Sequence, residues 1–218
     1  VLAGRLSNWS RLSSKVLRAR LLTAAVGLPF LVYLVGYASE RAFAGAILVL
    51  TGVGLWEYFT LTRAQCSLPS AWGVLWGILV ALSTLVGDFQ IMSVALIGGF
   101  IWVFILSLRD RQPERGLRTT STFLLGVVYV GFLFPHFVWI HSGLDGAAWV
   151  FFILLVAMLG DTGGYAIGRM WGKRKLLPHI SPGKTIEGSY GSVGGNCLAA
   201  LVAWHWLLPG RRLFELVV

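Results

Sequence analysis

The sequence has too little charge to cover the surface of an ordinary soluble domain. Charged residues make up 12% of its 218 residues, against roughly 25% in a typical soluble domain. Hydrophobic residues make up 56%, and the mean hydropathy is +0.76. This composition excludes a soluble globular fold and indicates an integral membrane protein.

Cysteine is also scarce, and several familiar site patterns are missing. Cys66 and Cys197 are too few and too far apart for a disulfide framework or a metal knuckle. We expect both to be small packing residues. No Ser-His-Asp order, zinc-ligand spacing, dinucleotide-binding glycine pattern or internal repeat is visible in the sequence.

Apolar runs long enough to cross a bilayer are abundant. A hydrocarbon core of about 30 Å takes about 20 helical residues, and such unbroken runs lack the alternation of a membrane barrel. The predicted spans are 21–38, 42–62, 71–87, 89–108, 119–140, 147–168 and 188–208. The sequence therefore predicts an all-α, polytopic membrane bundle with about seven transmembrane helices, in a domain that covers residues 21–218.

Residues 1–20 form a separate basic segment ahead of the first span. Over residues 5–20, apolar and basic side chains fall on opposite arcs of a helix: Leu6, Trp9, Leu12, Val16 and Leu17 against Arg11, Lys15 and Arg18. This pattern predicts an amphipathic helix at the cytoplasmic interface. A solvated basic tail is the alternative.

Basic residues fall mainly on one side of the predicted bundle. Of the 18 Lys and Arg residues, 15 lie in the N-terminal segment and in the connections after the second, fourth and sixth spans. Because such cations stay cytoplasmic, we expect the N-terminus and residues 160–188 to face the cytoplasm. Cations beside spans meet anionic lipid headgroups, so the net charge of +9 predicts membrane lipid and no nucleic acid as a partner.

Asp161 is an acid at the end of the apolar run 147–159. A carboxylate at the bilayer centre costs about 2.5–3.5 kcal/mol and is usually functional. Gly160, Gly163 and Gly164 either break the helix or let another backbone approach closely. We expect Asp161 to bind a hard cation such as Mg²⁺ near the cytoplasmic interface. A capping role at a helix end is the alternative.

A cluster of cations and hydroxyl groups follows. It comprises Lys173, Arg174, Lys175, His179 and the run Ser181-Pro182-Gly183-Lys184-Thr185. Pro182 and Gly183 predict a turn, and the ammonium of Lys184 beside backbone N–H groups suits phosphate oxygens. The run is not a Walker A loop, because Pro178 stands where that motif needs glycine. A loop that contacts lipid headgroups is the alternative, but together with Asp161 the cluster favours phosphoryl or nucleotidyl transfer.

Residues 160–188 resemble the central block of the phosphatidate cytidylyltransferases, also called CDP-diacylglycerol synthases. Gly-Asp-Thr-Gly-Gly-Tyr, Gly-Arg…Gly-Lys-Arg-Lys-Leu and Ser-Pro-Gly-Lys-Thr-Ile-Glu-Gly follow that family's order and spacing. Arg18-x-Arg20-Leu-Leu-Thr-Ala with Pro29, and Trp56-Glu57-Tyr58, also fit. The resemblance therefore covers essentially the whole chain.

The resemblance implies an inner-membrane enzyme of phospholipid biosynthesis. Such an enzyme transfers a nucleotidyl group from CTP to phosphatidic acid, requires Mg²⁺, and releases CDP-diacylglycerol and pyrophosphate. The residues carried over are Asp161 and Lys184 as catalytic residues, Lys173, Ser181 and Thr185 at the substrate phosphates, and Asp161 with Glu187 at the metal. Glu187 alternatively orients Lys184. A homodimer is one expected assembly.

The family's later C-terminal signature is absent from this sequence. That signature has a Lys-Arg, a Lys-Asp and a Gly-His-Gly-Gly followed by Asp-Arg-x-Asp, and none of these occurs here. We therefore expect residues 21–218 to be incomplete at the C-terminus, with further site residues supplied by a missing segment or a second chain. The alternative is a truncated, non-catalytic homologue that binds anionic lipid or a partner chain. A transporter is disfavoured, because repeat halves are lacking.

Overall fold

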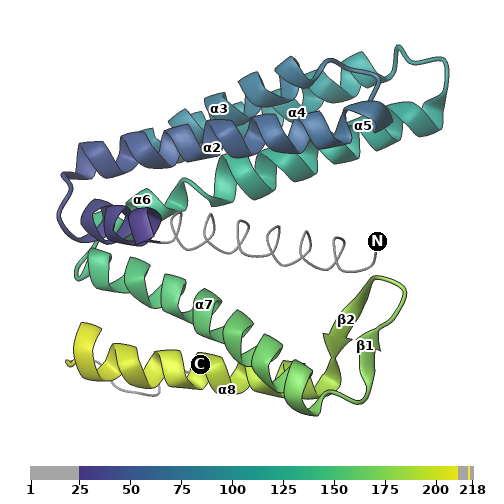
Figure 1. The fold of residues 1–218 in the computed structure, drawn as a ribbon. Coiled ribbons are helices and arrows are strands. Elements are labelled where there is room, and N and C mark those ends of the chain that lie inside the picture. Colours follow the sequence, from purple (N-terminus) through teal and green to yellow (C-terminus); the bar gives the residue numbers. More distant parts are fainter. Residues whose placement is uncertain (1–24, 211–215, 217–218) are drawn as a thin grey trace, which may run out of the picture. The chain divides into compact units, whose positions relative to one another are not determined.

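Helices make up most of the computed structural model, which describes residues 25–210 and residue 216 (Figure 1). The predicted amphipathic segment 1–20 lies outside the described residues. The chain divides into two compact units, Val1–Ser39 and Glu40–Val218. In the first unit, the described part contains the apolar helix Ala25–Gly36.

The second unit contains the remaining elements. In chain order they are α2 (Glu40–Thr62), η1 (Arg63–Gln65), α3 (Ser70–Val86), α4 (Phe89–Ser107), α5 (Pro113–Gly126), η2 (Val127–Leu133), α6 (His136–Ser142), α7 (Gly146–Trp171), β1 (Lys175–Leu177), β2 (Ser181–Thr185), α8 (Ile186–Val202) and η3 (Ala203–Leu207). Within the described residues, each predicted span coincides with a helical segment. The predicted all-α membrane fold is thus confirmed.

Four helices of the described part are long and apolar enough to cross a membrane. They are Glu40–Thr62, Phe89–Ser107, Pro113–Ser142 and Gly146–Trp171, and Ala25–Gly36 and Ser70–Val86 are shorter apolar helices. Polar side chains within these helices bond back to their own backbone: the Thr51 hydroxyl donates to the Ile47 carbonyl at 2.7 Å, and that of Thr84 to Val80 at 2.9 Å. These bonds satisfy hydroxyl groups that have no water to bind in a bilayer.

Helices α2, α3, α4 and α5 pack together around one apolar core (Figure 1). Leu55 and Phe59 of α2, Trp76 and Val80 of α3 and Phe123 of α5 are buried in it. Glycine makes this packing close, because Gly73 lies under the Phe59 ring and Gly77 lies under Leu55. Trp76 also donates its indole N–H to the Ala95 carbonyl of α4 at 2.9 Å.

The predicted span 119–140 is one helical path with an irregular middle. Val127–Leu133 is a π-helix. A Cβ at Gly131 would lie 2.8 Å from the Gly77 carbonyl oxygen, so the two backbones are in contact there. Pro135 has no N–H to give to the Gly131 carbonyl, and His136 Nδ1 lies 2.7 Å from the Phe132 carbonyl oxygen. Close packing and a proline together explain the local change of helix type.

The described part contains one sheet, an antiparallel hairpin of β1 and β2 between α7 and α8. Its turn is Leu177-Pro178-His179-Ile180, closed by the Ile180 N–H to the Leu177 carbonyl at 3.1 Å. The predicted turn at Pro182-Gly183 is therefore wrong. Pro178 takes the second position of the β-turn, which suits its fixed φ, and Pro182 lies on β2.

Candidate active site

Asp161 lies inside a continuous helix. Helix α7 runs without a break from Gly146 to Trp171, so Asp161 is ten residues before its end. At 1.5 Å per residue this places Asp161 about 15 Å from Trp171 along the helix axis. The two sequence alternatives of a helix break and a terminal cap at Asp161 are both wrong.

The glycines around Asp161 bring the backbones of α7 and α8 into contact. A Cβ on Gly163 would strike the Gly191 carbonyl, one on Gly195 would strike the Leu159 carbonyl, and one on Gly188 would lie 2.9 Å from the Gly164 carbonyl oxygen. Only residues without side chains allow this approach. Of the two roles that the sequence allows for these glycines, the structure therefore shows the close approach of another backbone and not a helix break.

One flank of the α7–α8 pair is polar. Thr185 at the N-cap of α8 and Ser189, Ser192 and Asn196 within α8 are spaced by four, three and four residues, which places them on one helix face. Asp161, Tyr165 and Gly168 on α7 and Gly172 at its C-cap have the same spacing. The two faces meet on one side of the pair, because Gly168 and Gly172 face the Thr185 hydroxyl and Gly164 faces that of Ser192. We call Asp161, Tyr165, Thr185, Ser189, Ser192 and Asn196 the polar flank.

The opposite flank of the same pair is apolar. An open groove of about 510 Å³ lies there between α7 and α8. Its lining includes Leu159, Ala166, Ile167 and Leu198, with Thr162 and Tyr190 as its polar members. The contrast between the two flanks places the amide of Asn196 and the hydroxyls of Thr185, Ser189 and Ser192 on the side that carries Asp161.

Glu187 fixes the base of the hairpin to the start of α8. Its Oε2 accepts the backbone N–H of Lys173 at 3.1 Å and that of Arg174 at 3.2 Å. The Ile186 N–H donates to the Arg174 carbonyl at 2.9 Å. The Thr185 hydroxyl caps α8 by accepting the Gly188 N–H at 3.1 Å. The phosphate contact predicted for Thr185 stays a prediction, and its observed role is to shape the chain at this point.

The pKa of the Glu187 carboxyl lies below its usual range. Its own backbone N–H is the largest cause, followed by the N–H groups of Lys173 and Arg174 and the charge of Arg174, while desolvation opposes them. Because the pKa is lowered on folding, this anchor is fully formed above the usual Glu pKa of about 4.3. It is lost as the pH falls through the lower, folded value.

We expect Glu187→Ala to increase hydrogen exchange over residues 173–175 about tenfold at pH 6.5, because a charged acceptor of two amides is removed. Glu187→Gln keeps one acceptor oxygen and should give a smaller increase. The ratio of exchange between Glu187→Ala and the wild type should approach one in acid, where the wild-type carboxylate is protonated. Equal exchange in all three proteins at pH 6.5 would show that the carboxylate does not hold the loop.

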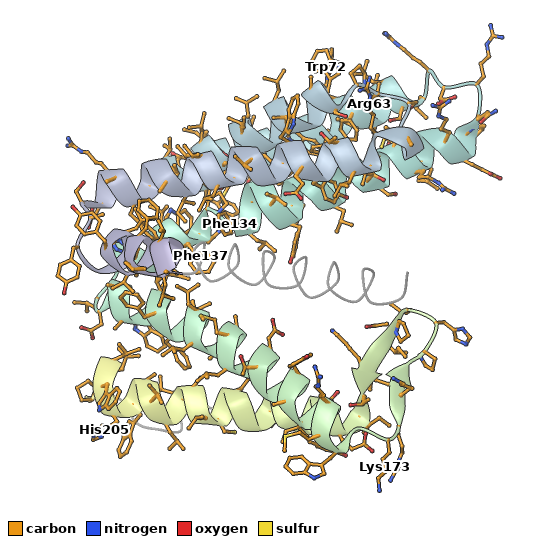
Figure 2. All side chains as sticks on the ribbon, viewed as in Figure 1. Arg63, Trp72, Phe134, Phe137, Lys173 and His205 are labelled. Carbon is orange, nitrogen blue, oxygen red and sulfur yellow. The ribbon has the colours of Figure 1, made fainter. Side chains whose placement is uncertain are left out.

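The predicted phosphate-binding residues lie on or beside the hairpin. Lys173 lies at its base (Figure 2), Ser181 begins β2, and Lys184 is exposed on β2 next to buried Thr185. Lys175 is engaged differently, since its Nζ donates to the Pro182 carbonyl at 2.7 Å. The structure thus brings the cations of the run 173–184 into one small element.

Asp161 and Glu187 do not lie at the same level of the helix pair. Asp161 is beside Gly160, which faces Asn196 of α8. Glu187 is nine residues before Asn196, or about 13 Å along α8. The two predicted metal ligands are therefore too far apart to bind one ion in this structure. Within residues 25–210, no three His, Cys, Asp or Glu side chains are grouped as metal ligands.

Asp161 alone still fits the needs of Mg²⁺. Mg²⁺ is commonly bound through one or two carboxylates, with water and substrate phosphates as its other ligands. Asp161 is exposed on the polar flank, on the same face as the side-chain oxygens of Ser192 and Asn196. Sequence reasoning missed Ser192 and Asn196, although their spacing from Thr185 was a usable signal.

Comparison with known proteins identifies the family. Residues 18–215 match the model of the Cytidylyltransferase family. The chain belongs to this family. The match includes the whole α7–hairpin–α8 region, so the polar flank and the cationic hairpin both lie within the family domain.

Several curated relatives are phosphatidate cytidylyltransferases. The chain is 31% identical to that of Staphylococcus haemolyticus over 191 residues, which are 85% of this chain and 71% of the relative. It is 29% identical to that of Thermotoga maritima over 182 residues, 82% of this chain and 65% of the relative. A shorter match to that of Staphylococcus epidermidis is 44% identical over 79 residues, 36% of this chain and 30% of the relative. The last two matches span less than two thirds of the relatives' length.

Proposed function

We propose that the α7–hairpin–α8 region carries the site of a nucleotidyl transfer from CTP to phosphatidic acid. The observation that carries this proposal is the polar flank, which connects an acid within a membrane helix to a cationic hairpin at the helix end. A site that binds a single phosphate group needs only the acid or only the cations. A triphosphate and a lipid phosphate that react together need both a metal ligand and several cations. The name of the relatives supplies the substrate class.

The proposed reaction is a displacement at the α-phosphorus of CTP. An oxygen of the lipid phosphate forms a bond to that phosphorus, and the bond from it to the oxygen bridging to the β-phosphorus breaks. The electron pair leaves with pyrophosphate, and the product is CDP-diacylglycerol. Both substrates are anionic, so the chain has to offset their repulsion before they can meet.

Residues of the α7–hairpin–α8 region have different proposed roles in this reaction, according to where they lie. Lys184 and Lys173, both exposed at the hairpin, neutralise phosphate charge, and Ser181 offers a hydroxyl from the start of β2. Thr185 and Glu187 hold the hairpin base in place through the hydrogen bonds described above. Asp161 would hold Mg²⁺, which when bound supplies charge stabilisation at the phosphate oxygens. Ser192 and Asn196 flank that position and orient groups beside Asp161.

We also propose an inner-membrane location with the hairpin on the cytoplasmic side, where CTP is available. Helix α7 has 26 residues, or about 39 Å, and exceeds a core of about 30 Å. With Gly146 at the far interface, Asp161 is about 8 Å inside the cytoplasmic interface. That depth is within reach of a lipid headgroup. Further carboxylates would come from a longer chain or from a second copy in a homodimer.

The test is product formation in membranes from cells depleted of their own synthase. Phosphatidic acid, Mg²⁺ and labelled CTP are supplied to the 218-residue chain, and to the same chain joined to the part of the Staphylococcus haemolyticus relative that lies beyond the match. CDP-diacylglycerol from either form supports the proposal. Silence of both forms, with normal membrane insertion, would favour the non-catalytic lipid-binding alternative.

We expect Lys184→Ala, in the active form, to raise the KM for CTP about tenfold or more, because a charge-assisted contact to phosphate is lost. Lys184→Arg keeps the charge and should retain more of the affinity. Arg109→Gln removes a cation from the α4–α5 connection and serves as the control. If Lys184→Ala and Arg109→Gln behave alike, Lys184 is not at the substrate.

A further inference from the structure

The hairpin tip exposes apolar side chains that the proposed reaction does not use. Leu177, the first residue of the β-turn, is 52% exposed, and Ile180, its last residue, is 80% exposed, with Pro178 between them. Just before the hairpin, Trp171 at the end of α7 is 57% exposed. Exposed apolar side chains are ordinary on helices that face lipid, but the hairpin is not part of a membrane-spanning helix and so needs another cover.

The same hairpin segment is rich in basic residues, most of them toward its base. Lys173, Arg174, Lys175, His179 and Lys184 all lie within the segment 173–184, which contains no acidic residue. The acid that follows, Glu187, is engaged by the backbone N–H groups of Lys173 and Arg174. The segment therefore combines an apolar tip with a net positive charge.

The course of the hairpin places this combination beside the membrane. β1 begins four residues after the end of α7, which is one of the four helices long and apolar enough to span. Figure 1 shows β1 and β2 running crosswise to α8, and not as an outward extension of it. A hairpin in that direction lies along the bilayer surface, where an apolar tip can enter the boundary between headgroups and acyl chains.

We propose that the hairpin tip is a membrane-docking element for anionic bilayers. Leu177, Pro178 and Ile180 enter the interfacial layer, and Arg174 and His179 contact headgroup phosphates. An anionic bilayer is the partner that satisfies both features, because it offers apolar depth and negative charge in the same place. This inference does not rest on the proposed reaction, since it uses only the composition and placement of the hairpin.

A fluorescent probe at the tip tests the proposal on the full 218-residue chain. The chain has two cysteines, so Cys66→Ser and Cys197→Ser give a background in which Ile180→Cys is labelled alone with an environment-sensitive dye. The Ile180 side chain is 80% exposed, so its replacement removes little packing. Gln112→Cys, an exposed position in the α4–α5 connection, carries the control label.

The labelled chain is reconstituted in phosphatidylcholine vesicles with or without about one third phosphatidylglycerol. In anionic vesicles we expect a blue-shifted emission at position 180 and at least twofold stronger quenching by shallow spin-labelled lipid than at position 112. The difference should shrink in neutral vesicles and at 1 M salt, where the Debye length falls to about 3 Å. Quenching at 180 no stronger than at 112 overturns the proposal, and so does a blue shift without lipid quenching, which would mean burial in protein.

Discussion

Asp161→Asn is expected to lower the rate of CDP-diacylglycerol formation about 100-fold or more while leaving membrane insertion unchanged. The substitution keeps the size of the side chain and removes the charge that would hold Mg²⁺ at the polar flank. Loss of one preorganised electrostatic group commonly costs about 10²–10³ in rate. Insertion should not suffer, because a neutral amide is cheaper than a carboxylate in a bilayer. The measurement is product formed per inserted chain, in the form of the protein that is active.

Asp110→Asn is the matched control for this experiment. It makes the same change from acid to amide in the connection between α4 and α5, where the Asp110 carboxylate accepts the nearby Gln112 N–H at 3.0 Å. Asp110→Asn should retain near-normal activity.

The Mg²⁺ concentration for half-maximal rate should rise at least about tenfold in Asp161→Glu. Near-normal activity of Asp161→Asn would remove Asp161 from the proposed site.

The membrane fold was predictable because the bilayer limits what a chain can do. A long apolar run must form a helix to satisfy its backbone, so the predicted span 89–108 differs from Phe89–Ser107 by one residue. Asp161 and the cationic run 173–184 also stood out by chemistry alone. The polar flank that connects Asp161 to this run was not predictable in the same way, because it depends on α7 and α8 packing side by side.

Other features depend on contacts between distant residues and were not predictable in this way. The π-helix Val127–Leu133 reflects the contact of Gly131 with Gly77, which are far apart in sequence. Both Pro178 and Pro182-Gly183 favour a turn, so local turn preferences do not decide which of them forms the hairpin turn. Asp161 is far from Glu187 because α7 continues without a break beyond Asp161. The glycine-rich sequence around Asp161 was equally compatible with a helix that ends there.

The glycine contacts between α7 and α8 lead to the prediction with the largest expected effect on stability. Gly195 and Gly194 are neighbours inside α8, so Ala has the same helix preference at both. A Cβ at Gly195 would strike the Leu159 carbonyl of α7, whereas a Cβ at Gly194 meets nothing within 4 Å. Gly195→Ala should lower the free energy of unfolding by about 3 kcal/mol through overpacking. Gly194→Ala should leave it unchanged or raise it by up to about 1 kcal/mol.

Unfolding in mixed micelles with increasing SDS measures both variants. The Leu159 carbonyl is backbone, so it cannot rotate away as a side chain would, and Gly195→Ala has to push the helices apart. That movement would also carry Asp161 away from Ser192 and Asn196, although all three residues remain. Activity should therefore fall in Gly195→Ala and persist in Gly194→Ala. Equal stability and equal activity of the two variants would show that α7 and α8 are not in backbone contact.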